Sequence, residues 1–270
     1  MKQLITYLLR YFSHKLKIEL APHMNLHYKQ WKKDEATPFK GWKFSYTKDR
    51  IVWEEPSWDY QAIAKELVQN SKSVLDIATG GGERFSALAP FPSHTVAIEG
   101  WHPNVEVAEE ELKPLGAQVL EIKDAGPYPF HDEEFDLVLN RHGGLAIQEI
   151  ARILQPGGQF LTQQVDGRDM EDLQAFFGAK PKWPDNNLEE VSKKLIANGF
   201  TIKQAESWIG RVTFLDVGAL VYHLTNIPWI VEGFSVDTHL KYLEALQEKL
   251  DRGEKLTYTV KRFLLWCEKE

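Results

Sequence analysis

Residues 73–88 contain the feature that most constrains this chain, an apolar run that breaks into the three consecutive glycines Gly80, Gly81 and Gly82 before a helix-forming segment. A strand, a glycine turn and a helix let the backbone approach a nucleotide-like ligand closely, because glycine adopts unusual φ/ψ values and has no side chain to clash. A dinucleotide fingerprint would need glycine at position 85, which is Phe85, and no Gly-Lys-Ser or Gly-Lys-Thr marks a P-loop. The turn therefore predicts a nucleotide site of another kind.

Residues 74–82, Val-Leu-Asp-Ile-Ala-Thr-Gly-Gly-Gly, resemble motif I of the class I S-adenosylmethionine (SAM) methyltransferases of type 11. Ala78 stands where that family has its first glycine, and a positive φ there would be strained. The resemblance implies that Asp76 organises the loop near the methionine amino group, or stabilises the turn alone. The implied loop residues that bind the cofactor are Asp76, Ala78, Thr79, Gly80, Gly81 and Gly82.

Glu99 ends the next apolar run, 19 residues after Gly80. An acid at about this spacing can accept both hydroxyls of a ribose, which we favour over a solvated glutamate at a strand end. Trp101 follows, and could pack on the adenine or against a helix.

The resemblance extends over residues 57–166. It implies that Asp124 and Ala125 contact the adenine, although Asp124 alone could be a turn residue before Gly126. Residues 128–138 resemble the segment that leads into the family's fourth strand. Asn140 follows that strand and is implied to lie at the cofactor.

Arg141 and Gln164 are predicted to face the substrate, because they follow or end strands at the same edge of the sheet. His142 is the candidate general base, since histidine titrates near neutrality; the alternative is a structural or substrate-shaping role. A base is needed only if the acceptor is protonated. One cysteine, Cys267, and the absence of an H-E-x-x-H motif predict no metal site.

Short apolar runs alternate with helical patterns from residue 73 onward, which predicts an α/β fold with a doubly wound, mostly parallel seven-stranded sheet of the Rossmann-like methyltransferase kind. The expected strands are 73–78, 94–99, 117–122, 135–139, 158–165, 200–207 and 256–266. An amphipathic helix is expected at 2–20, and a further helix at 59–69 with Ser57 as its N-cap. The expected domains are an N-terminal helical and aromatic extension, 1–56, serving as a substrate lid, and a SAM-binding domain, 57–270, with a helical insertion at 215–252 before the last strand.

The formal net charge is −7, yet residues 1–50 hold 11 Lys and Arg against 4 Asp and Glu. The acidic remainder disfavours broad nucleic-acid binding. No run approaches a membrane span, and no signal peptide is visible in residues 1–20, so a cytoplasmic protein is expected.

The function predicted from these features is methyl transfer from SAM to an oxygen or nitrogen of a small molecule. One alternative is an RNA methyltransferase that uses a basic aromatic platform, with Lys29, Lys32, Lys33, Lys40 and Lys43. Another is a SAM-fold protein without catalysis that serves as an interaction partner.

Overall fold

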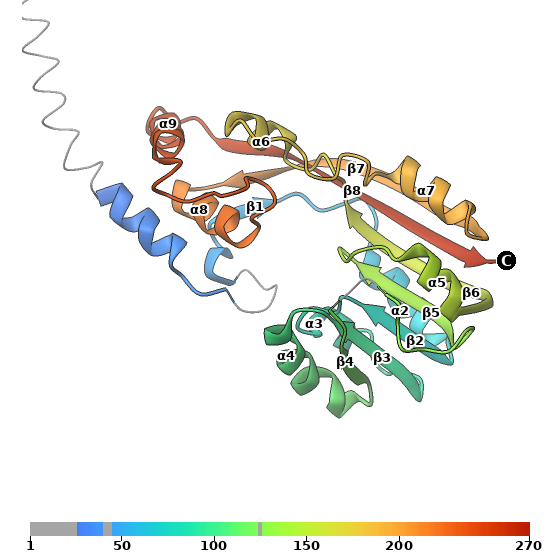
Figure 1. Ribbon diagram of the computed structural model, residues 1–270. Coiled ribbons are helices and arrows are strands. Elements are labelled where there is room, and N and C mark those ends of the chain that lie inside the picture. The colour runs from blue at the N-terminus through green and yellow to red at the C-terminus, as the bar shows by residue number, and fades with distance from the viewer. Residues whose placement is uncertain (1–25, 40–44, 124–125) are drawn as a thin grey trace, which may run out of the picture.

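The structure, a computed structural model, describes residues 26–39, 45–123 and 126–270. Within these ranges, eight strands form one sheet in the order β1-β7-β8-β6-β5-β2-β3-β4 (Figure 1). The strands are β1 Ile51–Trp53, β2 Ser73–Ile77, β3 His94–Glu99, β4 Gln118–Glu121, β5 Phe135–Arg141, β6 Leu154–Val165, β7 Phe200–Phe214 and β8 Leu256–Lys269. The predicted amphipathic helix at 2–20 lies outside the described residues.

The five strands β2 to β6 pair in parallel, whereas β8, β7 and β1 are antiparallel to their neighbours. The Rossmann-like methyltransferase fold is therefore confirmed. The predicted number of seven strands is wrong, because residues 51–53, assigned to the extension, pair with β7 as an eighth strand at the edge. This strand is only three residues long, too short for its sequence pattern to be recognised.

Helices cover both faces of the sheet, as a doubly wound fold requires. They are η1 Ser45–Thr47, α2 Tyr60–Gln69, α3 Glu83–Ser86, α4 His102–Leu112, η2 Lys113–Leu115, α5 Ile147–Ile153, α6 Glu171–Phe176, α7 Leu188–Ile196, α8 Val217–Asn226 and α9 Leu240–Asp251. Apolar residues of α2, α3 and α4 form one buried cluster with the sheet, and those of α5 and α7 form another on the opposite face. The apolar sides of these helices therefore pack against the two opposite faces of the same sheet.

The predicted N-cap of α2 is wrong. Asp59, not Ser57, accepts the backbone N–H of Ala62 at 3.0 Å and begins the helix. An aspartate and a serine two residues apart are both good caps, so residue type alone could not choose between them.

A second lobe is built on the far halves of β7 and β8, which extend beyond the rest of the sheet (Figure 1). Its buried cluster combines the ends of these strands with α6, α8, α9 and the helical residues 26–35. The predicted helical insertion before the last strand is α8 and α9. The insertion shares this core with α6 and the ends of β7 and β8, and Trp31, from the N-terminal part of the chain, is buried within it.

Arg50 joins the N-terminal part to the insertion. Its guanidinium donates two hydrogen bonds to Asp216, at 2.9 and 2.6 Å, and a third to the fully buried carboxylate of Asp34, at 3.0 Å. The Tyr46 hydroxyl donates to the same Asp34 carboxylate at 2.7 Å. Because a buried charge is tolerated only when paired and hydrogen-bonded, this network holds Asp34, Tyr46 and Arg50 against the N-terminus of α8.

Candidate functional site

The glycine loop, residues 78–82, connects β2 to α3 at the carboxyl edge of the parallel strands. Ala78, Gly80 and Gly82 all have positive φ, at 60°, 65° and 82°. Ala78 thus adopts the left-handed conformation that its methyl group disfavours. A Cβ on Gly82 would lie 2.9 Å from the Leu112 side chain, so glycine is required there for space as well as for φ. The loop brings its backbone close to α4.

Glu99 holds this loop in place. Its Oε2 accepts the N–H of Gly80 at 2.8 Å, and its Oε1 accepts the N–H groups of Gly100 and Trp101 at 3.0 and 2.9 Å. The side chain is buried, so these charge-assisted hydrogen bonds compensate for lost hydration. The 19-residue spacing in the sequence thus becomes a direct contact between the two elements.

A second loop, residues 142–144 after β5, packs against the glycine loop. The buried amide of Asn140 accepts the Gly143 N–H at 3.1 Å and donates to the Gly144 carbonyl at 3.0 Å. Gln164 donates to Asn140 Oδ1 at 2.8 Å. A Cβ on Gly143 would lie 2.6 Å from that of Ala78. Asn140 and Gln164 thus use polar atoms to shape this loop, and their contacts with a ligand stay predictions.

Four polar side chains, here called the polar row, follow one another across the sheet: Asp76 on β2, Arg141 on β5, Gln163 on β6 and Arg262 on β8. Two positions away in the same strand, each has an apolar residue that belongs to the buried cluster under α2, α3 and α4. These apolar residues are, in the same order as the strands, Val74, Leu139, Leu161 and Leu264. Since side chains two apart in a strand share a face, the row lies on that face, at the carboxyl ends of the parallel strands. This is the edge where open α/β sheets bind ligands.

His142 is hydrogen-bonded to the polar row through Gln163. The Trp58 indole donates to Gln163 Oε1 at 2.8 Å, which orients the amide so that its nitrogen faces His142 Nε2, 3.1 Å away. An amide nitrogen only donates, so His142 Nε2 accepts and the proton of the neutral ring is on Nδ1. Nε2, the nitrogen that would accept a proton from a substrate, therefore already accepts a hydrogen bond from Gln163.

The charges around His142 also favour its neutral form. His142 is exposed, yet desolvation and the positive charges of Arg141, Arg262 and Arg84 hold its pKa well below the usual 6.5. Its role as a general base stays a prediction. The direction of this pKa shift favours the neutral ring.

Asp76 is buried, and this desolvation raises its pKa to about 7, with the nearby charge of Glu99 adding to the shift. Tyr60, at the start of α2, faces the same group: burial and the Asp76 charge raise the pKa of its hydroxyl above the usual 10. The phenol therefore keeps its proton and is available as a hydrogen-bond donor.

Arg141 is half-buried, and its guanidinium forms no hydrogen bond or ion pair with any residue in the described ranges. Desolvation, together with the charges of Arg84 and Arg262, lowers its pKa to about 10. By contrast, Arg262 is neutralised by Asp169, whose carboxylate lies 2.6 Å from Nη1. The polar row thus contains one cation, Arg141, that forms no ion pair with a described residue.

Trp101, the N-cap of α4, is 42% exposed, and the ring of Phe39 stacks on it with centroids 6.4 Å apart. Phe39 comes from the N-terminal part of the chain, so that part reaches the end of β3. Asp124 and Ala125 lie outside the described residues. The sequence reasoning missed Trp58, Tyr60 and Arg84, although aromatic residues at the start of the predicted helix 59–69 were a usable signal.

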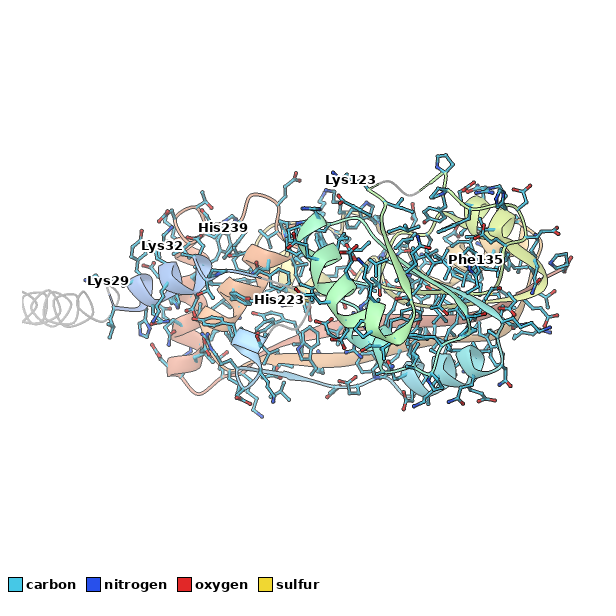
Figure 2. The ribbon with its side chains drawn as sticks, turned by 90° about the horizontal axis from the view of Figure 1, so that it is seen from below. Lys29, Lys32, Lys123, Phe135, His223 and His239 are labelled. Atoms are coloured by element: carbon cyan, nitrogen blue, oxygen red, sulfur yellow. The ribbon has the colours of Figure 1, made fainter. Side chains whose placement is uncertain are left out.

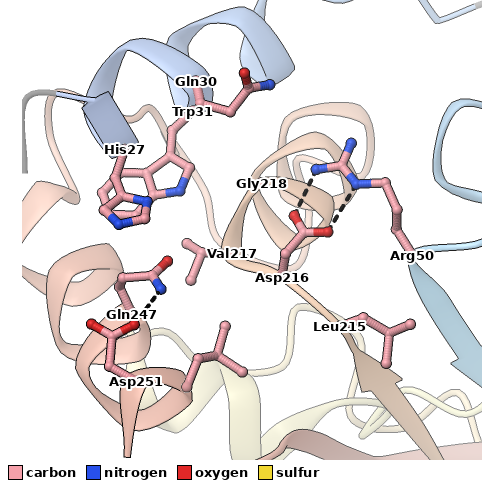
Figure 3. A pocket seen from close by; sticks show the side chains of 11 residues that line it. His27, Gln30, Trp31, Arg50, Leu215, Asp216, Val217, Gly218, Gln247 and Asp251 are labelled. Atoms are coloured by element: carbon pink, nitrogen blue, oxygen red, sulfur yellow. Dashed lines mark hydrogen bonds and ion pairs between the residues drawn. The ribbon is translucent and has the colours of Figure 1, made fainter. Parts of the chain in front are cut away.

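A separate cavity of about 510 Å³ lies in the second lobe, between the helical residues 26–35, α8 and α9 (Figure 3). His27 and Trp31 stack on one wall, and the paired Arg50 and Asp216 form another. None of its lining residues belongs to the glycine loop or the polar row. The cavity is therefore distinct from the predicted site.

The lysines of the proposed RNA platform lie on the second lobe where they are described. Figure 2 shows Lys29 and Lys32 at one end of the molecule, and Phe135, in the core under the parallel strands, toward the other. Lys32 is paired with Glu35 and Asp237. Lys40 and Lys43 lie outside the described residues. The observed placement gives this platform no specific support.

Within the described ranges, no three His, Cys, Asp or Glu side chains gather as a metal site would require. Among the same residues, no helix is both long and apolar enough to cross a membrane.

The glycine loop lies within a segment that matches a known family. Residues 75–162, from β2 to β6, match a family described as "Methyltransferase domain". Over these residues, which include the glycine loop, the chain is similar to that family. A proposed methyltransferase of Bacillus halodurans C-125 has the same fold, with a TM-score of 0.53 at 19% identity over 76% of this chain and 97% of that one.

Two curated relatives are similar to part of this chain. The demethylmenaquinone methyltransferase of Clavibacter sepedonicus is 30% identical over 33% of this chain and 39% of its own length. The fatty-acid O-methyltransferase of Mycolicibacterium smegmatis is 26% identical over 51% of each chain. This chain therefore spans about half, or less, of the relatives it matches.

Proposed function

We propose that this protein is a SAM-dependent methyltransferase whose acceptor is a small molecule. The observation that carries the proposal is the hydrogen bond from Gly80 N–H to Glu99, which joins the glycine loop to the acid expected at the ribose. The match to a methyltransferase domain supports it. Both curated relatives are named for small-molecule acceptors, a demethylmenaquinone and a fatty acid.

The cofactor site we propose lies over the carboxyl ends of β2 and β3. The backbone of residues 78–82 approaches the methionine part and the ribose, with Asp76 beneath, and Glu99 accepts from the ribose hydroxyls. Carboxylate oxygens have lone pairs beyond those that bind Gly80, Gly100 and Trp101, so the ribose need not displace these N–H groups. Trp101, Asn140, Asp124 and Ala125 complete the proposed site.

The N-terminal part is proposed as the lid of the acceptor site. The stacking of Phe39 on Trp101 supports this, because it brings a ring of residues 1–56 to the proposed adenine site. The hydrogen bonds from Arg50 to Asp34 and to Asp216, the N-cap of α8, support a lid carried by the second lobe. Such a cover excludes water and aligns acceptor with donor, effects worth about 7–11 kcal/mol in favourable cases.

Calorimetric titration with S-adenosylhomocysteine tests the cofactor site. The wild-type protein should bind it, and E99A should bind it at least about tenfold more weakly, because the ribose loses a charge-assisted partner. E110A is the matched control, since Glu110 is an exposed glutamate of α4. A folded wild-type protein that does not bind S-adenosylhomocysteine would contradict the proposal and favour the non-catalytic alternative.

A further inference from the structure

The proposed cofactor site leaves two groups unused, one in the polar row and one beside it on α2. They are the guanidinium of Arg141 and the hydroxyl of Tyr60, neither of which forms a hydrogen bond or ion pair with another described residue. Arg141 follows Asn140 at the end of β5. Tyr60, at the start of α2, packs on the same face of the sheet, where its hydroxyl and the Arg141 charge interact. Two donors at one point, without an acceptor from the protein, form a receptor for an anion.

The charges nearby agree in sign. Arg84, from the helix that follows the glycine loop, also forms no ion pair with a described residue, and Arg262 belongs to the same row. Two carboxyl groups oppose this charge, the buried Asp76 and the exposed Glu55, and neither forms an ion pair with Arg141. A half-buried guanidinium surrounded by like charges gains most when an anion arrives, because it regains the electrostatic stabilisation lost with its water.

We propose that the acceptor is a carboxylate, which Arg141 and Tyr60 bind at the end of β5. This inference rests on the proposed methyltransferase function and names its substrate class. A guanidinium matches a carboxylate with two parallel N–H donors, and the protonated phenol adds a third hydrogen bond.

The chemistry fits the state of His142. A carboxylate oxygen attacks the methyl carbon of the sulfonium, the carbon–sulfur bond breaks, and its electron pair stays on sulfur. The products are a methyl ester and S-adenosylhomocysteine, and the charges of the two reactants cancel. No proton moves, so the reaction needs no general base. A neutral histidine whose Nε2 already accepts from Gln163 is compatible with this step.

The methionine part of the cofactor also carries a carboxylate, so the experiment must separate the two anions. S-adenosylhomocysteine contains that carboxylate, whereas 5′-methylthioadenosine lacks the amino acid. We expect R141Q to bind both compounds within about threefold of the wild type. A loss of tenfold or more for S-adenosylhomocysteine alone would show that Arg141 binds the cofactor's carboxylate, which would overturn the inference and leave the proposed function intact.

The acceptor is tested on protein saturated with S-adenosylhomocysteine, with butanoate, octanoate and dodecanoate against the alcohols of the same chain length. We expect at least one carboxylate to bind tighter than its alcohol, and R141Q to weaken that binding at least about tenfold. R252Q is the matched control, because Arg252 is exposed in the turn before β8. With SAM, mass spectrometry should detect the methyl ester. If no carboxylate of the set exceeds its alcohol, the inference is wrong.

Discussion

Replacing Asp76 with asparagine should change the pH dependence of stability. Asp76 is a buried carboxyl whose pKa rises from 3.8 to about 7 in the folded protein. Between these values the native state holds a proton that the unfolded state has released, so the free energy of unfolding of the wild type falls as pH rises. The contribution is fully present below the unfolded pKa and lost by pH 7.

The magnitude follows from the shift. One pKa unit corresponds to about 1.4 kcal/mol, so the two units between pH 5 and pH 7 give about 3 kcal/mol, and little changes above pH 7. Asparagine has nearly the same shape and no charge to bury. D76N should therefore gain stability relative to the wild type by about 2–3 kcal/mol between pH 5 and pH 8.

Urea unfolding at pH 5, 6, 7 and 8 measures this difference. D185N is the control, since Asp185 is an exposed aspartate in the loop before α7 and undergoes the same substitution outside the site. An equal D76N effect at pH 5 and pH 8 would refute the reasoning, because it would mean that Asp76 is already ionised in the folded protein at both values.

The same group should couple to the cofactor. SAM is a cation at sulfur and at its amino group, so binding beside Asp76 should favour the carboxylate and release a proton between pH 6 and pH 7. Calorimetry at pH 6.5 in two buffers with different ionisation enthalpies measures that proton, and D76N should release none. Equal proton release in both proteins would place the cofactor's charge elsewhere.

Three further substitutions test the geometry by urea unfolding. G82A should lower the free energy of unfolding by more than 2 kcal/mol, because φ is positive and the added methyl group would lie 2.9 Å from the Leu112 side chain. G116A has a similar φ but open space around it, so it should lower the free energy of unfolding by only about 1 kcal/mol. G143A should lose about 1–3 kcal/mol, and A78G in the same chain should restore most of it, since the two methyl groups clash with each other. R50M should cost about 3–5 kcal/mol by leaving its buried aspartate partner without a cation; a loss below 1 kcal/mol would mean that the aspartate is not charged there.

The parts that the sequence predicted depend on local pattern. The glycine loop follows from three consecutive small residues after an apolar strand, and Glu99 follows from its spacing. The alternation of strands and helices predicted the doubly wound sheet, and the helices of the insertion were visible from their own periodicity. Even the strain at Ala78 was predictable, since a non-glycine residue occupies a glycine position, and its φ is 60°.

Tertiary structure decided which side chains meet. The hydrogen bond between Trp58 and Gln163 joins residues 105 positions apart. It orients the Gln163 amide so that its nitrogen donates to Nε2 of His142. Whether Arg141 is paired depends on the register of β5 and on what α2 and α3 bring to the same face. A short strand such as β1 and the core of the second lobe likewise arise from segments distant in sequence. Periodicity tells which face of an element is apolar, but the partner of a polar group depends on how the elements pack, and local sequence does not encode that packing.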